Sequence, residues 1–147
     1  MQESGRGRER PVGQTSGSTN RPPHEVSAAV TVLDLAQEVA TLRQEPAWQQ
    51  NDRNARTFVK EADLRVVLTV LKQGAIIKEH RAPGTAVVQV VSGRIRLRIA
   101  DQAVELSAGQ VVVLERDVPH DIEALEESGF AIIIGWPASP PADERGR

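Results

Sequence analysis

The sequence predicts an all-β domain, a sandwich or a jelly-roll barrel, with one helix before it. From about residue 56 onward apolar and polar residues alternate, which is the period of a strand with one buried and one solvated face. Turn residues recur about every eight to ten positions as far as residue 136, a spacing typical of many short antiparallel strands. About eight or nine strands over residues 56–136 fit a jelly-roll barrel.

The alternation is clearest over residues 94–99, where three arginines alternate with Ile95, Leu97 and Ile99. We interpret the arginine side as a solvated sheet face. Ser92 and Gly93 come directly before this strand and predict a tight hairpin with the strand before it. The other expected strands are 57–61, 65–71, 85–91, 104–106, 111–115, 121–125 and 130–136.

Residues 31–43 give the one clear helix signal, because Val32, Leu35, Val39 and Leu42 form an apolar stripe at helical spacing. We expect Thr31 to cap this helix and Pro46 to limit its extension. The stripe should pack on the barrel or on a second subunit. The chain thus divides into a disordered tail (1–27), the helix with its connection (28–55), the barrel (56–136) and a disordered C-terminal tail (137–147).

Composition excludes several classes of function. The net charge of −2 does not favour broad electrostatic capture of nucleic acid. The chain has no cysteine, which excludes disulfides, thiolate metal ligands and cysteine nucleophiles. It also has no apolar run long enough to span a membrane and no apolar export signal. We therefore expect a cytoplasmic protein that binds neither nucleic acid nor a membrane, with an aliphatic core.

Histidine is the one residue type that points to a site. His24 lies in the N-terminal tail, whereas His80 and His120 each lie at the end of an expected strand. Two histidines on neighbouring strands can converge inside a barrel, where imidazole nitrogens suit a divalent transition metal. No P-loop, G-x-S-x-G or H-E-x-x-H motif accompanies them.

The spacing around these histidines resembles the two sequence motifs of the cupin superfamily, whose members are small double-stranded β-helix barrels. Gly74, His80 and Gly93 occupy the positions of the first family motif. Gly109 and His120 occupy those of the second, in which Glu115, Asp117 and Ala124 stand for the family's Pro, Gly and Asn. The resemblance covers about residues 56–136 and implies a small single-domain cupin that commonly pairs as a homodimer.

The departures from the motifs concern the metal ligands. In metal-binding relatives the cation is held by two histidines and a Glu of the first motif and by the histidine of the second. Here Ala82 replaces the second of these histidines and Ala86 replaces the Glu. The resemblance therefore implies a degenerate site in which His80 and His120 hold no metal, or hold Fe, Mn, Ni or Zn only weakly.

Strand alternation suggests a further ligand-binding residue. If His80 points into the barrel, then Lys78 and Ile76 should point inward too, and Glu79 should point outward. Asp121 should likewise point away from the side of His120. Lys78 beside His80 would repel a cation and suit a carboxylate or a phosphate.

Three functions remain open. The favoured one is a non-catalytic barrel that binds a small molecule or serves as a sensory or auxiliary domain. The alternative is a metal-dependent enzyme, resembling a dioxygenase or an isomerase, that uses His80 and His120. In the third, the helix and the tail recruit a protein partner. Residues 130–136 are apolar on both faces, so we expect a homodimer, unless the helix at 31–43 covers the outer face.

Overall fold

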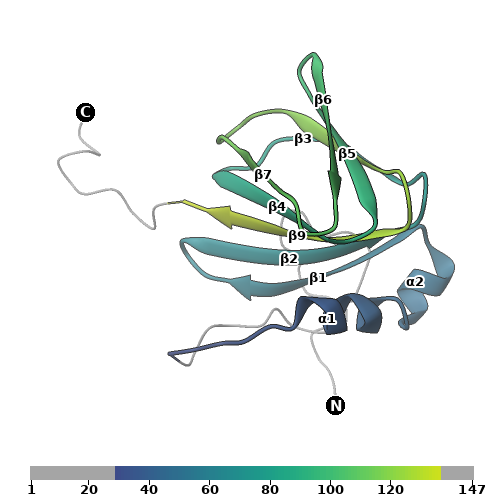
Figure 1. Cartoon of the computed structure of the whole chain (residues 1–147). Coiled ribbons are helices and arrows are strands. Elements are labelled where there is room, and N and C mark those ends of the chain that lie inside the picture. The colour runs from purple at the N-terminus through teal and green to yellow at the C-terminus, as the bar shows by residue number, and fades with distance from the viewer. Residues whose placement is uncertain (1–28, 137–147) are drawn as a thin grey trace.

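A computed structural model describes residues 29–136, and the tails predicted at 1–27 and 137–147 lie outside the described residues. Two antiparallel sheets lie face to face, with two short helices beside them (Figure 1). Sheet A has the strand order β1-β2-β9-β4-β7, and sheet B has the order β3-β8-β5-β6. The elements are α1 (Leu35–Leu42), α2 (Pro46–Gln50), β1 (Arg53–Lys60), β2 (Leu64–Leu71), β3 (Ile76–His80), β4 (Thr85–Ser92), β5 (Arg94–Ile99), β6 (Gln102–Ser107), β7 (Val111–Leu114), β8 (His120–Ala124) and β9 (Ser128–Gly135).

The hairpin predicted at Ser92-Gly93 is wrong. β4 pairs with β7 and β9 in sheet A, whereas β5 pairs with β6 and β8 in sheet B. The Ser-Gly pair is instead a corner at which the chain passes from one sheet to the other. Gly93 has φ +81°, and a Cβ on it would lie 2.2 Å from the Glu127 carbonyl oxygen, so only glycine fits this corner.

The barrel core lies between the two sheets and is aliphatic, as the composition predicts. Ile95, Leu97 and Ile122 of sheet B are fully buried and belong to the same cluster as Val88 and Phe130 of sheet A. Alternate residues of each strand supply this cluster, which is the pattern of two sheets packed through their inner faces.

The predicted helix is present but shorter, and a second helix follows it. Asp34, not Thr31, caps α1, because its side chain accepts a 3.1 Å hydrogen bond from the backbone N–H of Gln37. Pro46 starts α2 at its first turn instead of only ending the helical region. Trp48 of α2 is buried in a second apolar cluster.

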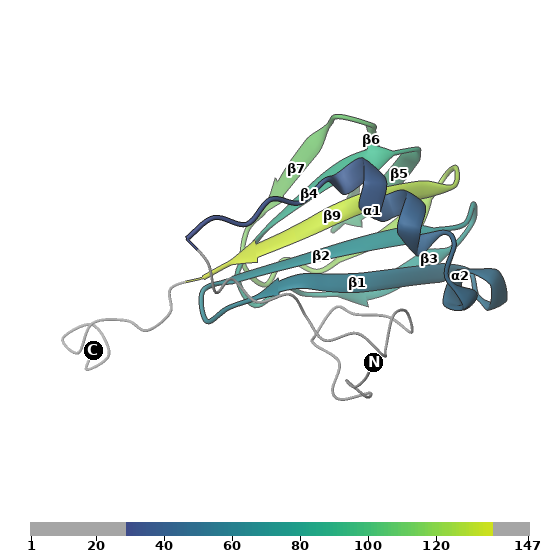
Figure 2. The same ribbon diagram turned by 90° about the horizontal axis from the view of Figure 1, so that it is seen from below.

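Helix α1 covers part of the outer face of sheet A (Figure 2). Val39 and Leu42 are buried against Leu68 of β2 and Ala131 of β9. A Cβ on Gly129 would lie 2.8 Å from Cγ2 of Val39, so glycine in β9 lets the helix approach closely. The helix therefore covers the outer face of β9 at Gly129 and Ala131, which is part of the cover that this apolar face requires. None of the helices within residues 29–136 has the length and apolar character needed to cross a membrane.

Candidate functional site at one end of the barrel

His80 and His120 meet at one end of the barrel. They are directly paired residues of β3 and β8, and their ring centroids lie 4.3 Å apart with the ring planes inclined at 59°. His120 is 4% exposed, and His80 is half-buried. The structure thus brings together the two histidines that the sequence selects, 40 positions apart in the chain.

Backbone hydrogen bonds orient both imidazole rings. Nδ1 of His80 lies 2.9 Å from the carbonyl oxygen of Lys78, and Nδ1 of His120 lies 2.9 Å from that of Val118. A carbonyl oxygen only accepts, so each Nδ1 carries the proton and donates it. In the neutral ring Nε2 is then an unprotonated acceptor. The site therefore presents two neighbouring nitrogen lone pairs.

The expectation that Lys78 points inward with His80 is wrong. Ile77 pairs with Ile122 and His80 pairs with His120, so β3 has one more residue than β8 between the two pairs. This β-bulge shifts the alternation, so that Ile77 packs on the barrel core while Ile76 and Lys78 are exposed.

The two alanines leave the histidines without the other ligands of a metal centre. Ala82 and Ala86 are buried, at 8% and 1% exposure, where the resemblance expects a histidine and a glutamate. Within residues 29–136 no group of three or more His, Cys, Asp or Glu side chains is placed to hold a metal ion. Two imidazoles alone do not fit the four-ligand centre of metal-binding cupins.

Arg65 and Trp136 form a second polar feature, which the sequence analysis missed. Along β2, Leu71 belongs to the barrel core whereas Leu68 and Val70 belong to the outer cluster, so the odd-numbered positions, Arg65 included, face inward. The Arg65 guanidinium carbon lies 5.6 Å from the centroid of the Trp136 ring, which packs on the barrel core. In the sequence, Arg65 alternates with the outward-facing residues of β2, and this alternation is the signal that could have identified it as an inward-facing residue.

Arg65 and Trp136 lie at the same end of the barrel as the histidines. Ile134 of β9 pairs with Arg65 on one side and with Ala86 on the other, and the connection from β3 to β4 joins Ala86 to His80. A Cβ on Gly84, within that connection, would lie 2.3 Å from the Gly135 carbonyl oxygen and 3.0 Å from Cβ of Trp136. We call this end, with His80, His120, Arg65, Trp136 and Ala86, the barrel mouth.

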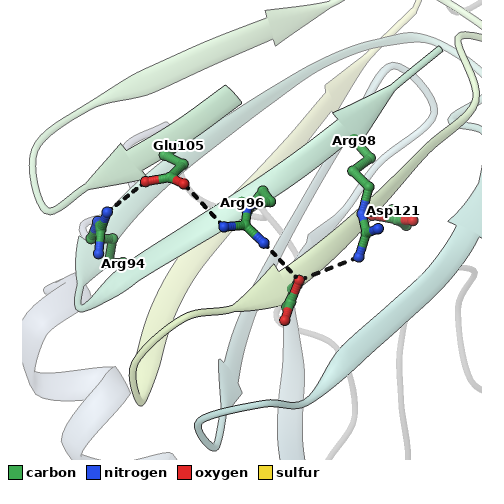
Figure 3. Close-up of polar contacts among 6 residues, drawn as sticks. Arg94, Arg96, Arg98, Glu105 and Asp121 are labelled. Atoms are coloured by element: carbon green, nitrogen blue, oxygen red, sulfur yellow. Dashed lines mark hydrogen bonds and ion pairs between the residues drawn. The ribbon is translucent and has the colours of Figure 1, made fainter. Parts of the chain in front are cut away.

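The outer face of sheet B carries a ladder of ion pairs (Figure 3). Its three arginines are those of the predicted solvated strand, and each contacts a carboxylate of β6 or β8. Hydrogen bonds from Arg96 and Arg94 hold the pKa of Glu105 below its usual value. The arginine stripe is therefore neutralised within the chain. The pairs are Arg94–Glu105, Arg96–Glu105, Arg96–Glu123, Arg98–Glu123 and Arg98–Asp121.

A surface cavity of about 320 Å³ lies at the end of this ladder, lined by Glu79, Arg98 and Asp121 among others. Asp121 and Arg98 are directly opposed on β8 and β5, on the face away from the histidine pair. Glu79 and Asp121 thus point away from the imidazoles, as strand alternation predicts.

Burial lowers the pKa of His120. Desolvation is the largest cause and the neighbouring His80 adds to it, while the hydrogen bond to the Val118 carbonyl and the charge of Asp121 act in the opposite direction. The His120 imidazole is therefore neutral at pH 7, which keeps the Nε2 lone pair available.

Because of this shift, metal-free protein should lose stability as the pH falls below the unfolded-state value of 6.5. The unfolded chain then binds a proton that folded His120 binds less readily, so the free energy of unfolding decreases until the folded pKa is passed. Urea unfolding across this range, with a chelator present, should show a smaller decrease for His120→Gln. An equal decrease in both proteins would contradict a buried, neutral His120.

The comparisons with known proteins agree with this architecture. Residues 67–134 match the family model described as a cupin domain, and this match together with the similar solved structures supports membership of the cupin superfamily. A search of curated proteins gave no match.

Several solved structures share the fold. A conserved protein of unknown function from Streptococcus pyogenes is 27% identical, with a TM-score of 0.61 over 80% of this chain and 96% of that one. A cupin-2 domain protein from Shewanella frigidimarina is 21% identical, with a TM-score of 0.57 over 71% and 95%. The cupin domain of an XRE family transcriptional regulator from Enterobacter cloacae is 20% identical, with a TM-score of 0.52 over 59% and 99%.

Proposed function

We propose that this protein is a non-catalytic cupin barrel that binds a small organic molecule at the barrel mouth through His80 and His120. The observation that carries the proposal is the orientation of the two rings. Both Nδ1 atoms donate to backbone carbonyls, so two Nε2 acceptors stand 40 positions apart in sequence but side by side in space. Such a pair suits a ligand that offers hydrogen-bond donors.

The alternative, a metal-dependent dioxygenase-like or isomerase-like enzyme, needs at least one further ligand. Ala82 and Ala86 carry no donor atom, and Glu79 and Asp121 lie on the other face of sheet B. The recruitment of a partner by the helix stripe is also disfavoured, because Val39 and Leu42 are buried on the chain's own sheet. We therefore favour binding without metal chemistry.

A ligand screen in the presence of a chelator tests the proposal. Ligands should raise the melting temperature of the wild-type protein, should not raise that of a His80→Ala, His120→Ala variant, and should be recovered unchanged. Hits that still bind the double variant would place the site elsewhere. Conversion of a hit to a product, or binding only after a divalent metal is added, would favour the enzyme.

We also propose that the protein is a homodimer, through an uncharged patch on the outer face of sheet A that α1 leaves open. Val111 and Val113 of edge strand β7 are 49% and 63% exposed. Val87 pairs with Val113 and with Ile133, so an apolar row crosses three strands. A two-fold interface uses one surface twice, and a patch without charge does not repel its own copy.

The variant Val113→Glu should therefore convert the dimer to a monomer, because two glutamates would meet across the two-fold axis without partners. Light scattering should give twice the chain mass for the wild type and one chain mass for the variant. Arg98→Glu, on the outer face of the other sheet, is the control and should remain dimeric. A monomeric wild type at high concentration would refute the pairing.

A further inference from the structure

We infer that the ligand of the barrel mouth is a small organic oxyanion that also carries a hydroxyl group, with the oxyanion on Arg65 and the hydroxyl on the histidine pair. The inference rests on the proposed function of the mouth and adds the ligand class to it.

Arg65 differs from the other half-buried arginines of the described chain in having no carboxylate partner. Its Nε is buried without a hydrogen-bond partner, and no ion pair joins its guanidinium to another described residue. Each of the others has at least one: Arg43–Glu127, Arg53–Asp52, Arg56–Glu38, and Arg96 with both Glu105 and Glu123. A partly desolvated guanidinium without an anion is costly, so Arg65 is placed to receive one from outside the described residues.

Trp136 holds the guanidinium in a defined orientation. An arginine above an indole ring is stabilised by the cation–π interaction, and its donor groups remain free at the edge of the plane. Arginine donors match the geometry of a carboxylate or a phosphate, to which they bind in bidentate fashion. The ladder on the outer face of sheet B offers no comparable site, because its arginines already contact carboxylates.

The histidine pair requires a different group on the same ligand. The two Nε2 lone pairs repel an oxyanion and accept a hydrogen bond from a hydroxyl. A ligand with only an oxyanion leaves these acceptors unsatisfied, and a neutral polyol leaves Arg65 unpaired. The mouth is therefore complementary to a molecule with both groups.

Four related probes test this: glycerate, glycerol phosphate, glycerol and propanoate. Binding is followed by nuclear magnetic resonance, through the imidazole nitrogens of His80 and His120. Glycerate, glycerol phosphate or both should bind, and their order distinguishes a carboxylate site from a phosphate site. Glycerol and propanoate, which each lack one group, should bind at least about tenfold more weakly, since each loses one set of charge-assisted or hydroxyl contacts.

Variants then assign the two ends of the ligand. Arg65→Gln should lower the affinity for the tighter-binding acid by about tenfold or more and leave the affinity for glycerol unchanged. The matched control Arg98→Gln, on the outer face of sheet B, should bind both like the wild type. His80→Ala with His120→Ala removes the imidazole signals, so its binding is measured by calorimetric titration; this variant should bind the acid more weakly than the wild type does and should bind propanoate as the wild type does.

The outcomes separate the inference from the proposed function. Equal binding of glycerol and the acids, or full affinity in Arg65→Gln, overturns the inference and leaves the histidine site intact. If neither acid binds but another molecule shifts the signals of the two histidines, the inference is likewise overturned and the histidine site remains. Failure of both acids together with an empty ligand screen overturns both.

Discussion

The double variant Ala82→His with Ala86→Glu is expected to acquire a divalent metal site. The two substitutions place the missing imidazole and carboxylate beside His80 and His120, at positions that are already buried at the barrel mouth. Four ligands complete the coordination that two cannot. Loss of a residue that only orients a metal ligand typically costs about 10–100-fold in metal affinity, so two added ligands should raise the affinity for zinc or nickel by at least about a hundredfold.

A matched variant separates ligation from added bulk. Ala82→Leu with Ala86→Leu brings similar volume without donor atoms and should show only the cost of overpacking, about 1–3 kcal/mol each. Calorimetric titration with zinc should show saturable binding in the first variant and not in the second. A folded first variant with the wild-type response to zinc would mean that these alanines do not stand at ligand positions.

The variant Phe130→Ala is expected to lower the free energy of unfolding by about 3–5 kcal/mol. Phe130 is fully buried in the barrel core, on the central strand β9 between Thr69 of β2 and Val90 of β4. Domains of this size have a total stability of about 5–15 kcal/mol, so the variant should be partly unfolded well below the melting temperature of the wild type.

Guanidinium unfolding measures this effect, with Val32→Ala, at a position that is 85% exposed and outside the proposed dimer patch, as the control. Its loss should stay within about 0.5 kcal/mol, as for an ordinary surface substitution. A loss below about 1 kcal/mol in Phe130→Ala would mean that the ring borders open space instead of a packed interior, in contrast to the burial seen here.

Local patterns of the sequence predict much of the barrel. Strand alternation identifies Ile95 and Leu97 as core residues, and both are fully buried. The spacing of the glycines and histidines places His80 opposite His120, because the family motifs encode which strands become neighbours. These features follow from residues near in sequence or from a resemblance that already contains the long-range pairing.

The errors concern features that depend on contacts far away in the chain. A Ser-Gly turn looks the same whether the chain returns within one sheet or passes to the other, and the packing of Gly93 on Glu127 decides it. The β-bulge in β3 appears only in the register with β8, and it moves Lys78 out of the mouth. Arg65 is a candidate ligand-binding residue because it has no carboxylate partner among the described residues. The sequence alone does not show which arginines are paired.

Metal content of tag-free protein is the most direct test of the central claim, that the histidine pair binds without a metal. Mass spectrometry should find far less than one equivalent of iron, manganese, nickel or zinc, after purification and again after incubation with each ion and desalting. The His80→Ala, His120→Ala variant should give the same low values. About one equivalent of metal in the wild type, absent from the variant, would contradict the account and identify a metal centre completed by a ligand outside the described residues.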